Sequence, residues 1–213
     1  MRTRELISRV AAGAAGAVLL VGVAGAAFAD DDPGYGTDDV DVNVTIGEAA
    51  EPGVLAMTVA GDSTALTESG STATIRQFTG TLPTVTVTDT RVFPDRISPD
   101  AFWYVLGSTS DFIGTAGQPA ITAGHLGWTP ALVGTTDPGE VAAGDPVDTV
   151  LDTGPDAVGV VDQELLAMAA SSADINPTGS WSVNAGLTLK TPITVAPGNY
   201  TSTLTLSLFE FTG

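Results

Sequence analysis

The sequence predicts an all-β protein, a single antiparallel β-sandwich or barrel-like domain that follows an N-terminal signal peptide. Apolar residues recur at every second position in several short runs, which is the period of a strand with one buried face. Turns that contain Pro or Gly separate these runs, and short strands between such turns favour a sandwich or a barrel. The 184 residues that follow residue 29 are enough to bury one sizeable core.

The first 29 residues have the pattern of a secretory signal peptide. Residues 1–9 carry three arginines, residues 10–26 are apolar, and residues 27–29 form an A-x-A cleavage site before three aspartates. An uncleaved membrane anchor is the alternative, but the glycines of the apolar stretch weaken a spanning helix. We therefore expect cleavage after Ala29 and a secreted protein that has no contact with the membrane afterwards.

Residues 30–39, DDDPGYGTDD, predict an acidic flexible tail, and residues 40–213 are predicted to form the β-domain. The domain opens with residues 40–46, VDVNVTI, in which Val and Ile alternate with polar residues as in a strand. The aspartates of residues 30–41 and Asn43 supply oxygen ligands for calcium, but they lack the spacing of a calcium-binding loop. We expect no cofactor, with Ca²⁺ in this acidic segment as the alternative.

Five further strands are predicted where β-branched and aromatic residues gather between turns, over residues 54–59, 72–78, 84–90, 102–108 and 181–189. The last predicted strand, residues 200–211, has Tyr200, Ser202 and the leucines at residues 204, 206 and 208 on one face, and Thr or Ser on the other. At about 3.3 Å per residue it would be near 40 Å long, so we expect it to bend or to extend past its neighbours. Residues 162–172 fit either a short amphipathic helix capped by Asp162 or a buried strand over residues 164–170.

The charge balance excludes several classes of function. The chain has 25 acidic and 7 basic side chains, a net charge of -18, and without residues 1–29 it has 24 and 4, a net charge of -20. Four cations cannot neutralise a row of phosphates, so nucleic acid is excluded as a partner, and so is an anionic membrane. Because the chain has no cysteine, it has no disulfide, no thiolate nucleophile and no Cys-ligated metal.

Few residues are suited to catalysis. His125 is the only histidine, and the chain has no G-x-S-x-G motif. Two carboxylates could act as a glycosidase pair, but acids in so acidic a chain are expected on the solvated surface unless two of them line a cleft. Lys190, the only lysine, could form an internal crosslink with Asn184 or Asn199, but an exposed side chain is expected at its strand end. We expect no enzymatic activity, and a secreted hydrolase is the less favoured alternative.

The aromatic residues are the candidate ligand-binding groups. Trp103 and Tyr104 are adjacent, so they lie on opposite faces of a strand and at most one of them is in the core. The core is the favoured place for each tryptophan considered separately, including Trp128 and Trp181. An exposed Trp or Tyr would offer an apolar platform for a sugar ring.

Two stretches resemble motifs of WxL-type cell-surface domains. Residues 84–91, TVTVTDTR, followed by the run FWYVL at residues 102–106, resemble the first motif region of that family. Residues 197–208, PGNYTSTLTLSL, are similar to its closing motif, and the likeness extends loosely from residue 40 to the end. Leu106 stands one position later than the motif leucine, and Leu206 stands where the family has its second tryptophan.

The resemblance implies a protein that a Gram-positive bacterium secretes and holds on its cell wall non-covalently, and the bias toward Ala, Gly, Asp, Thr and Val suggests an actinobacterial source. The implied partners are peptidoglycan or another cell-wall glycan, and other cell-surface proteins form a further class. We expect the wall to be bound by Trp103, Tyr104, Leu106, Trp128, Tyr200, Leu206 and Leu208. The alternative is a structural role, in which strand edges such as residues 200–211 pair with other chains to form a surface layer or a fibre.

Overall fold

The structure is a computed structural model that describes residues 44, 53–92, 97, 98, 100–134, 140–175 and 179–212. The chain divides into two units, Met1–Glu48 and Ala49–Gly213. Three predictions lie outside the described residues: the signal peptide, the acidic tail with its candidate calcium ligands, and the strand at residues 40–46. Val44 is the one residue of that strand that the structure describes. Among the helices in the described ranges, none is long and apolar enough to cross a membrane.

The described part of the second unit consists of antiparallel strands with almost no helix, which confirms the all-β prediction. The first sheet contains β1 (Leu55–Val59), β2 (Thr67–Glu68), β3 (Ile75–Thr81), β4 (Val85–Asp89), β7 (Leu126–Val133) and β10 (Ser180–Pro192). The long strand β10 pairs with β7 along one edge and with β4 and then β3 along the other. β1 pairs with β4 and β2 with β3, so these two short strands form the outer edge of this sheet.

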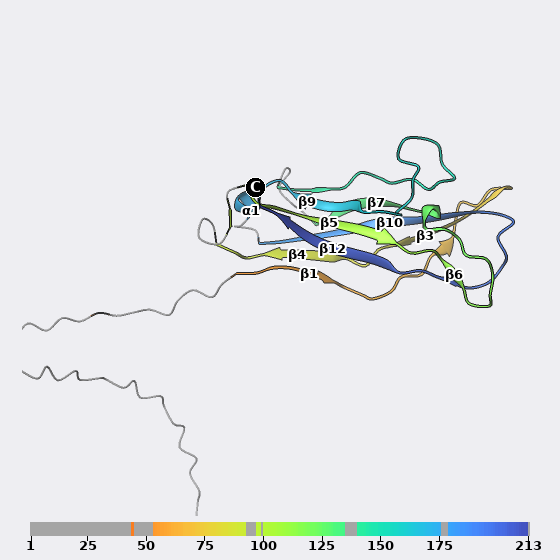
Figure 1. Cartoon of the computed structure of the whole chain (residues 1–213), viewed down its shortest axis with the longest axis horizontal. Helices are drawn as coiled ribbons and strands as arrows, with labels where there is room; N and C mark the ends of the chain where they lie inside the picture. The colour runs from red at the N-terminus through yellow and green to blue at the C-terminus, as the bar shows by residue number, and fades with distance from the viewer. Residues whose placement is uncertain are drawn as a thin grey trace, which may run out of the picture. The chain divides into compact units, whose positions relative to one another are not determined.

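The second sheet has the order β12-β5-β9-β8. Its strands are β5 (Phe102–Thr109), β8 (Val141–Ala143), β9 (Glu164–Ala169) and β12 (Leu204–Phe211). The smaller elements are β6 (Ile113–Gly114), which pairs with β11 (Tyr200–Thr201), the 3-10 turn Ala123–His125 and the one-turn helix α1 (Ser172–Ile175). Figure 1 shows the longer strands of both sheets running nearly along one axis.

The core lies between the two sheets and contains all three tryptophans. Alternate residues of β4, β5 and β10 are buried, as their period of two requires. The rings of Trp103 and Trp181 pack together with centroids 6.2 Å apart. Gly107 of β5 leaves room for Trp128, because a Cβ atom at residue 107 would lie 2.5 Å from a carbon of that indole ring. The favoured placement of each tryptophan in the core is therefore confirmed.

Most of the predicted strands are present. The predictions at residues 54–59, 84–90, 102–108 and 181–189 correspond to β1, β4, β5 and β10, and the one at residues 72–78 begins three residues later as β3. The single long strand predicted at residues 200–211 is divided into two, because the chain pairs with β6 up to Thr201 and with β5 only from Leu204. The run at residues 162–172 contains strand β9, so its helical alternative is wrong.

Strand β7 was not predicted, because Gly127 and Pro130 interrupt its pattern. Trp128 exchanges two backbone hydrogen bonds with Val147, so its N–H points away from β10. Pro130 is two residues further and has the same orientation, so the N–H that proline lacks is not needed for the pairing with β10. The position of this strand at the border of the sheet thus makes the proline acceptable.

Candidate functional site

The seven predicted wall-binding residues do not form one surface. Trp103 and Trp128 are fully buried in the core, so a ligand outside the domain does not reach their rings, and we do not retain them as ligand contacts. Leu208 is half-buried and packs against the same core. The remaining four residues divide between the outer face of the second sheet and a cleft, which are two separate candidate sites.

Tyr104 and Leu106 lie on the outer face of the second sheet, because they alternate along β5 with buried residues. The register of β5 and β12 places Phe209 opposite Tyr104 and Phe211 opposite Phe102. Both pairs are stacked, with ring centroids 5.4 Å and 5.1 Å apart. These four rings form a continuous aromatic patch, the aromatic platform.

The aromatic platform is open to solvent on its β12 side. Phe209 and Phe211 are 37% and 51% exposed, although both are large apolar residues. In the described part of the chain β12 pairs with β5 and with no further strand, so no strand covers the side of these two rings that faces away from β5. On the β9 side Met168 lies opposite Tyr104 and extends the apolar surface. The sequence analysis missed both phenylalanines, because only the register of β12 brings them beside Phe102 and Tyr104.

A cluster of one arginine and two carboxylates, of which Asp89 is buried, holds the strand that carries the platform. Glu210 lies between Phe209 and Phe211, and its carboxylate binds the guanidinium of Arg91, which follows β4. The Nε and Nη2 atoms of Arg91 donate to the two carboxylate oxygens of Asp89 at 2.8 Å each, and Asp89 is fully buried. The hydrogen bonds to Asp89 raise the pKa of Arg91 further above its ordinary value. The T-D-T-R stretch of the sequence thus joins the first sheet to the end of β12.

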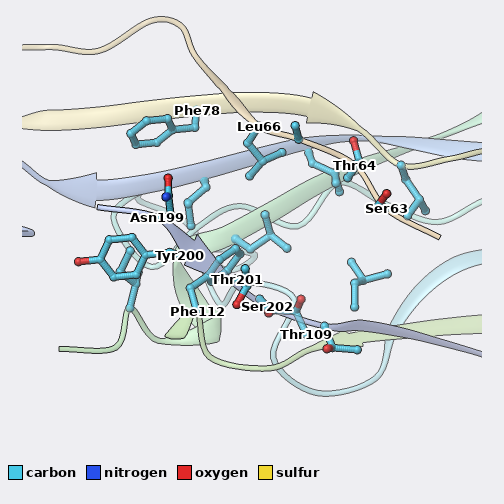
Figure 2. Close-up of a pocket in the computed structure, with 18 of the residues that line it drawn as sticks. Ser63, Thr64, Leu66, Phe78, Thr109, Phe112, Asn199, Tyr200, Thr201 and Ser202 are labelled. Atoms are coloured by element: carbon cyan, nitrogen blue, oxygen red, sulfur yellow. The ribbon is translucent and has the colours of Figure 1, made fainter. Parts of the chain in front are cut away.

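The second candidate site is a cleft with a volume of about 1310 Å³ between the outer edges of the two sheets. Figure 2 shows Phe78 of the first sheet and Leu66, which precedes β2, on one side of it, and Phe112 and Tyr200 on the other. Most of the apolar side chains that line it are half-buried or buried: Met57, Leu66, Phe78, Leu82, Phe112, Ile121, Leu126, Leu187, Leu189, Leu204 and Leu206. Serine, threonine and asparagine side chains stand at the same surface: Ser63, Thr64, Thr109, Asn199, Thr201 and Ser202.

The charges at the cleft do not form a catalytic pair. Among the described residues that line the cleft, Asp62 is the only one that carries a carboxylate. Arg76 is paired with Glu68 and lies over the Phe78 ring, with its guanidinium carbon 5.1 Å from the ring centroid. Tyr200, one of the predicted binding residues, donates its hydroxyl hydrogen to the carbonyl of Ala196 at 2.8 Å. The cleft therefore offers an apolar interior with a hydroxyl rim.

The other residues that the sequence analysis considered have structural partners. The Nδ1 atom of His125 lies 2.9 Å from the hydroxyl oxygen of Thr122. Lys190 donates to the carboxylate of Asp152. The covalent crosslink considered above would instead join its Nζ atom to an asparagine side chain. Burial raises the pKa of Asp152, but the hydrogen bonds from Lys190 and Thr149 outweigh it and lower the pKa overall. Among the described residues, no group of three or more His, Asp or Glu side chains could hold a metal ion.

Comparisons with known proteins do not establish a family. No protein-family model matches the chain, and no curated protein does. Among solved structures, a family 123 glycoside hydrolase from Clostridium perfringens, studied for glycolipid glycan hydrolysis, matches with 15% identity and a TM-score of 0.30. The match covers 63% of this chain and 18% of the hydrolase chain. Because the TM-score is so low, the match supports no conclusion about family or activity.

Proposed function

We propose that this chain is an exported, non-enzymatic surface protein that binds a cell-wall glycan, such as peptidoglycan, non-covalently through the aromatic platform. The observation that supports it is the exposure of Phe209 and Phe211 beside Tyr104 and Phe102 on the outer face of a sheet. The faces of sugar rings are apolar and stack on aromatic rings without any need for charge. Tyr104 also carries a hydroxyl group that can hydrogen-bond to a sugar.

The charge of the chain favours this mode of binding over an electrostatic one. A net charge of -18 opposes attachment to a wall that contains anionic polymers. At physiological ionic strength that repulsion is screened beyond about 8 Å, so short-range stacking remains effective. Salt is therefore expected to leave the attachment intact, whereas it would release a basic wall-binding protein.

Retention on purified peptidoglycan tests the proposal. The variant Phe209→Ala/Phe211→Ala removes the two exposed rings and leaves the core unchanged, and Ile193→Ala is the matched control because Ile193 is 52% exposed and lies outside the platform. Each aromatic stacking contact contributes about 0.5–1.5 kcal/mol, so the loss of two of them should weaken binding by about fivefold to 150-fold. The proposal is wrong if the double variant and the control are retained equally, or if the parent protein is not retained.

A second candidate function is structural assembly through strand edges. In the described ranges, β1 and β12 each pair with one strand only, and both lie beside the cleft. Such edges can accept a strand from another chain. This observation supports assembly independently of the aromatic platform.

A further inference from the structure

The cleft is an opening in the side of the sandwich where the two sheets are not closed by a strand. β1 contributes Met57 and Val59 to one wall, and β12 contributes Leu204 and Leu206 to the other. On the opposite side of the domain the sheets are joined, because Trp128 of β7 bridges to Val147, close to β8. The cleft therefore leaves core-facing apolar side chains accessible from one side only.

The cleft has the dimensions and the chemistry for one extended strand. Its wall along β11 and the start of β12 runs from Tyr200 to Leu206, seven residues, which corresponds to about 23 Å of extended chain. Its interior is apolar and its rim carries hydroxyl groups such as those of Ser63 and Ser202. A strand that enters it would place alternate side chains in the apolar interior and could pair its backbone with the free edge of β1 or β12.

Residues 40–46 of this chain fit those requirements. The segment is seven residues long, and Val40, Val42, Val44 and Ile46 occupy one face of an extended chain while Asp41, Asn43 and Thr45 occupy the other. Val44, the described member of the segment, is 80% exposed, so its side chain is not buried in the structure of the single chain. In an extended chain, an apolar face of four β-branched residues needs a partner surface that covers it.

We propose that residues 40–46 of one copy of this chain enter the cleft of a second copy as an added strand. Burial of four Val and Ile side chains favours association and can offset its entropic cost. The contact is heterologous, because a donor segment meets an acceptor cleft, and such contacts produce rings or open filaments. This proposal does not depend on glycan binding by the aromatic platform.

Charge makes the assembly salt-dependent in a defined direction. Without residues 1–29 each copy carries a net charge of -20, so copies repel one another at low ionic strength. The contact itself is apolar and needs no ion pair. Added salt should therefore promote assembly, whereas it would weaken an association that depends on opposite charges.

The test uses two variants that add the same charge to opposite faces of the segment. Val42→Asp/Val44→Asp places two carboxylates on the apolar face, and Asn43→Asp/Thr45→Asp places two on the polar face. The average mass of the purified exported protein is measured by light scattering over a range of concentrations at low and high salt. We expect the parent protein and the polar-face variant to rise at least about twofold in mass with concentration, and the apolar-face variant to remain monomeric.

A second measurement examines the cleft directly. The monomeric Val42→Asp/Val44→Asp variant keeps an empty cleft and should bind a labelled synthetic peptide of residues 38–48, whereas the same variant with Val59→Asp at the cleft wall should not. Val59 is 41% exposed, so this substitution leaves the buried core intact. A parent protein that is monomeric at every concentration, equal assembly of the two charge variants, or equal peptide binding with and without Val59→Asp would each overturn the proposal.

Discussion

Replacement of Arg91 by methionine should destabilise the domain strongly, because it leaves a buried carboxylate without its partner. Asp89 has no exposed surface, and both of its carboxylate oxygens accept hydrogen bonds from Arg91. Methionine keeps the apolar length of the arginine side chain and removes only the guanidinium. The change therefore tests the charge pair rather than the packing.

The size of the effect follows from the burial of the pair. Removal of one partner of a buried ion pair costs about 3–5 kcal/mol, because the other charge stays desolvated. The side chains of Arg91 and Glu210 are 14% and 28% exposed, so water reaches one end of the cluster and the lower limit, about 3 kcal/mol, is the appropriate value. For a domain of this size that loss lowers the melting temperature by about 6–12 °C.

The matched control is Arg76→Met, since Arg76 makes the same two-bond contact with Glu68 at 3.1 Å and 2.7 Å. That pair is exposed, with side-chain exposures of 38% and 42%, so its loss should change stability far less. Urea denaturation of both variants, followed by tryptophan fluorescence, measures the free energy of unfolding. If Arg91→Met is no more destabilising than Arg76→Met, burial does not determine the importance of the pair and the reasoning is refuted.

Two further substitutions test the packing of the core and the effect of burial on an acidic side chain. Gly107→Ala should destabilise the domain by about 1–3 kcal/mol, because the added methyl group meets the Trp128 ring at 2.5 Å. Gly186→Ala is the control, since a methyl group there has open space and should not destabilise the domain. Urea denaturation of both variants measures the difference in the free energy of unfolding. Burial raises the pKa of Glu164, so the folded state binds its proton more tightly than the unfolded state does, and this acid opposes folding above its ordinary pKa of 4.5. Glu164→Gln should therefore raise the melting temperature at pH 7 and have no such effect at about pH 4, and an equal gain at both pH values would contradict the assignment.

The fold was predictable from the sequence where a strand buries one face, because that burial leaves a period of two. β4, β5 and β10 show that period, and the adjacency of Trp103 and Tyr104 correctly indicated that only one of them lies in the core. β7 escaped prediction, because the acceptability of Pro130 depends on which side of the strand meets a neighbour. Which side of a strand meets a neighbour depends on how the strands pair, and the sequence of the strand alone does not show it.

The candidate sites were predictable only in part, for the same reason. Tyr104 was identified, but Phe209 and Phe211 join it only through the register of two strands that are about 100 residues apart in the chain. The buried location of Trp128 follows from the space at Gly107, which no local pattern shows. The cleft depends on the absence of a strand between β1 and β12 in the described part of the sheets, and a local sequence pattern does not indicate where a sandwich is open.

The ion pairs of the domain explain why both proposed contacts are apolar. Arg76, Arg91 and Lys190 are the cations among the described residues, and each is paired with an acidic side chain. None of these cations is therefore available to attract an anionic ligand, while the chain as a whole carries a net charge of -18. Any partner must be held by surfaces that need no charge, and the aromatic platform and the cleft are such surfaces. Higher ionic strength should consequently preserve wall retention and promote assembly together, and a decrease of both with salt would show that unidentified charge contacts govern the binding of this protein.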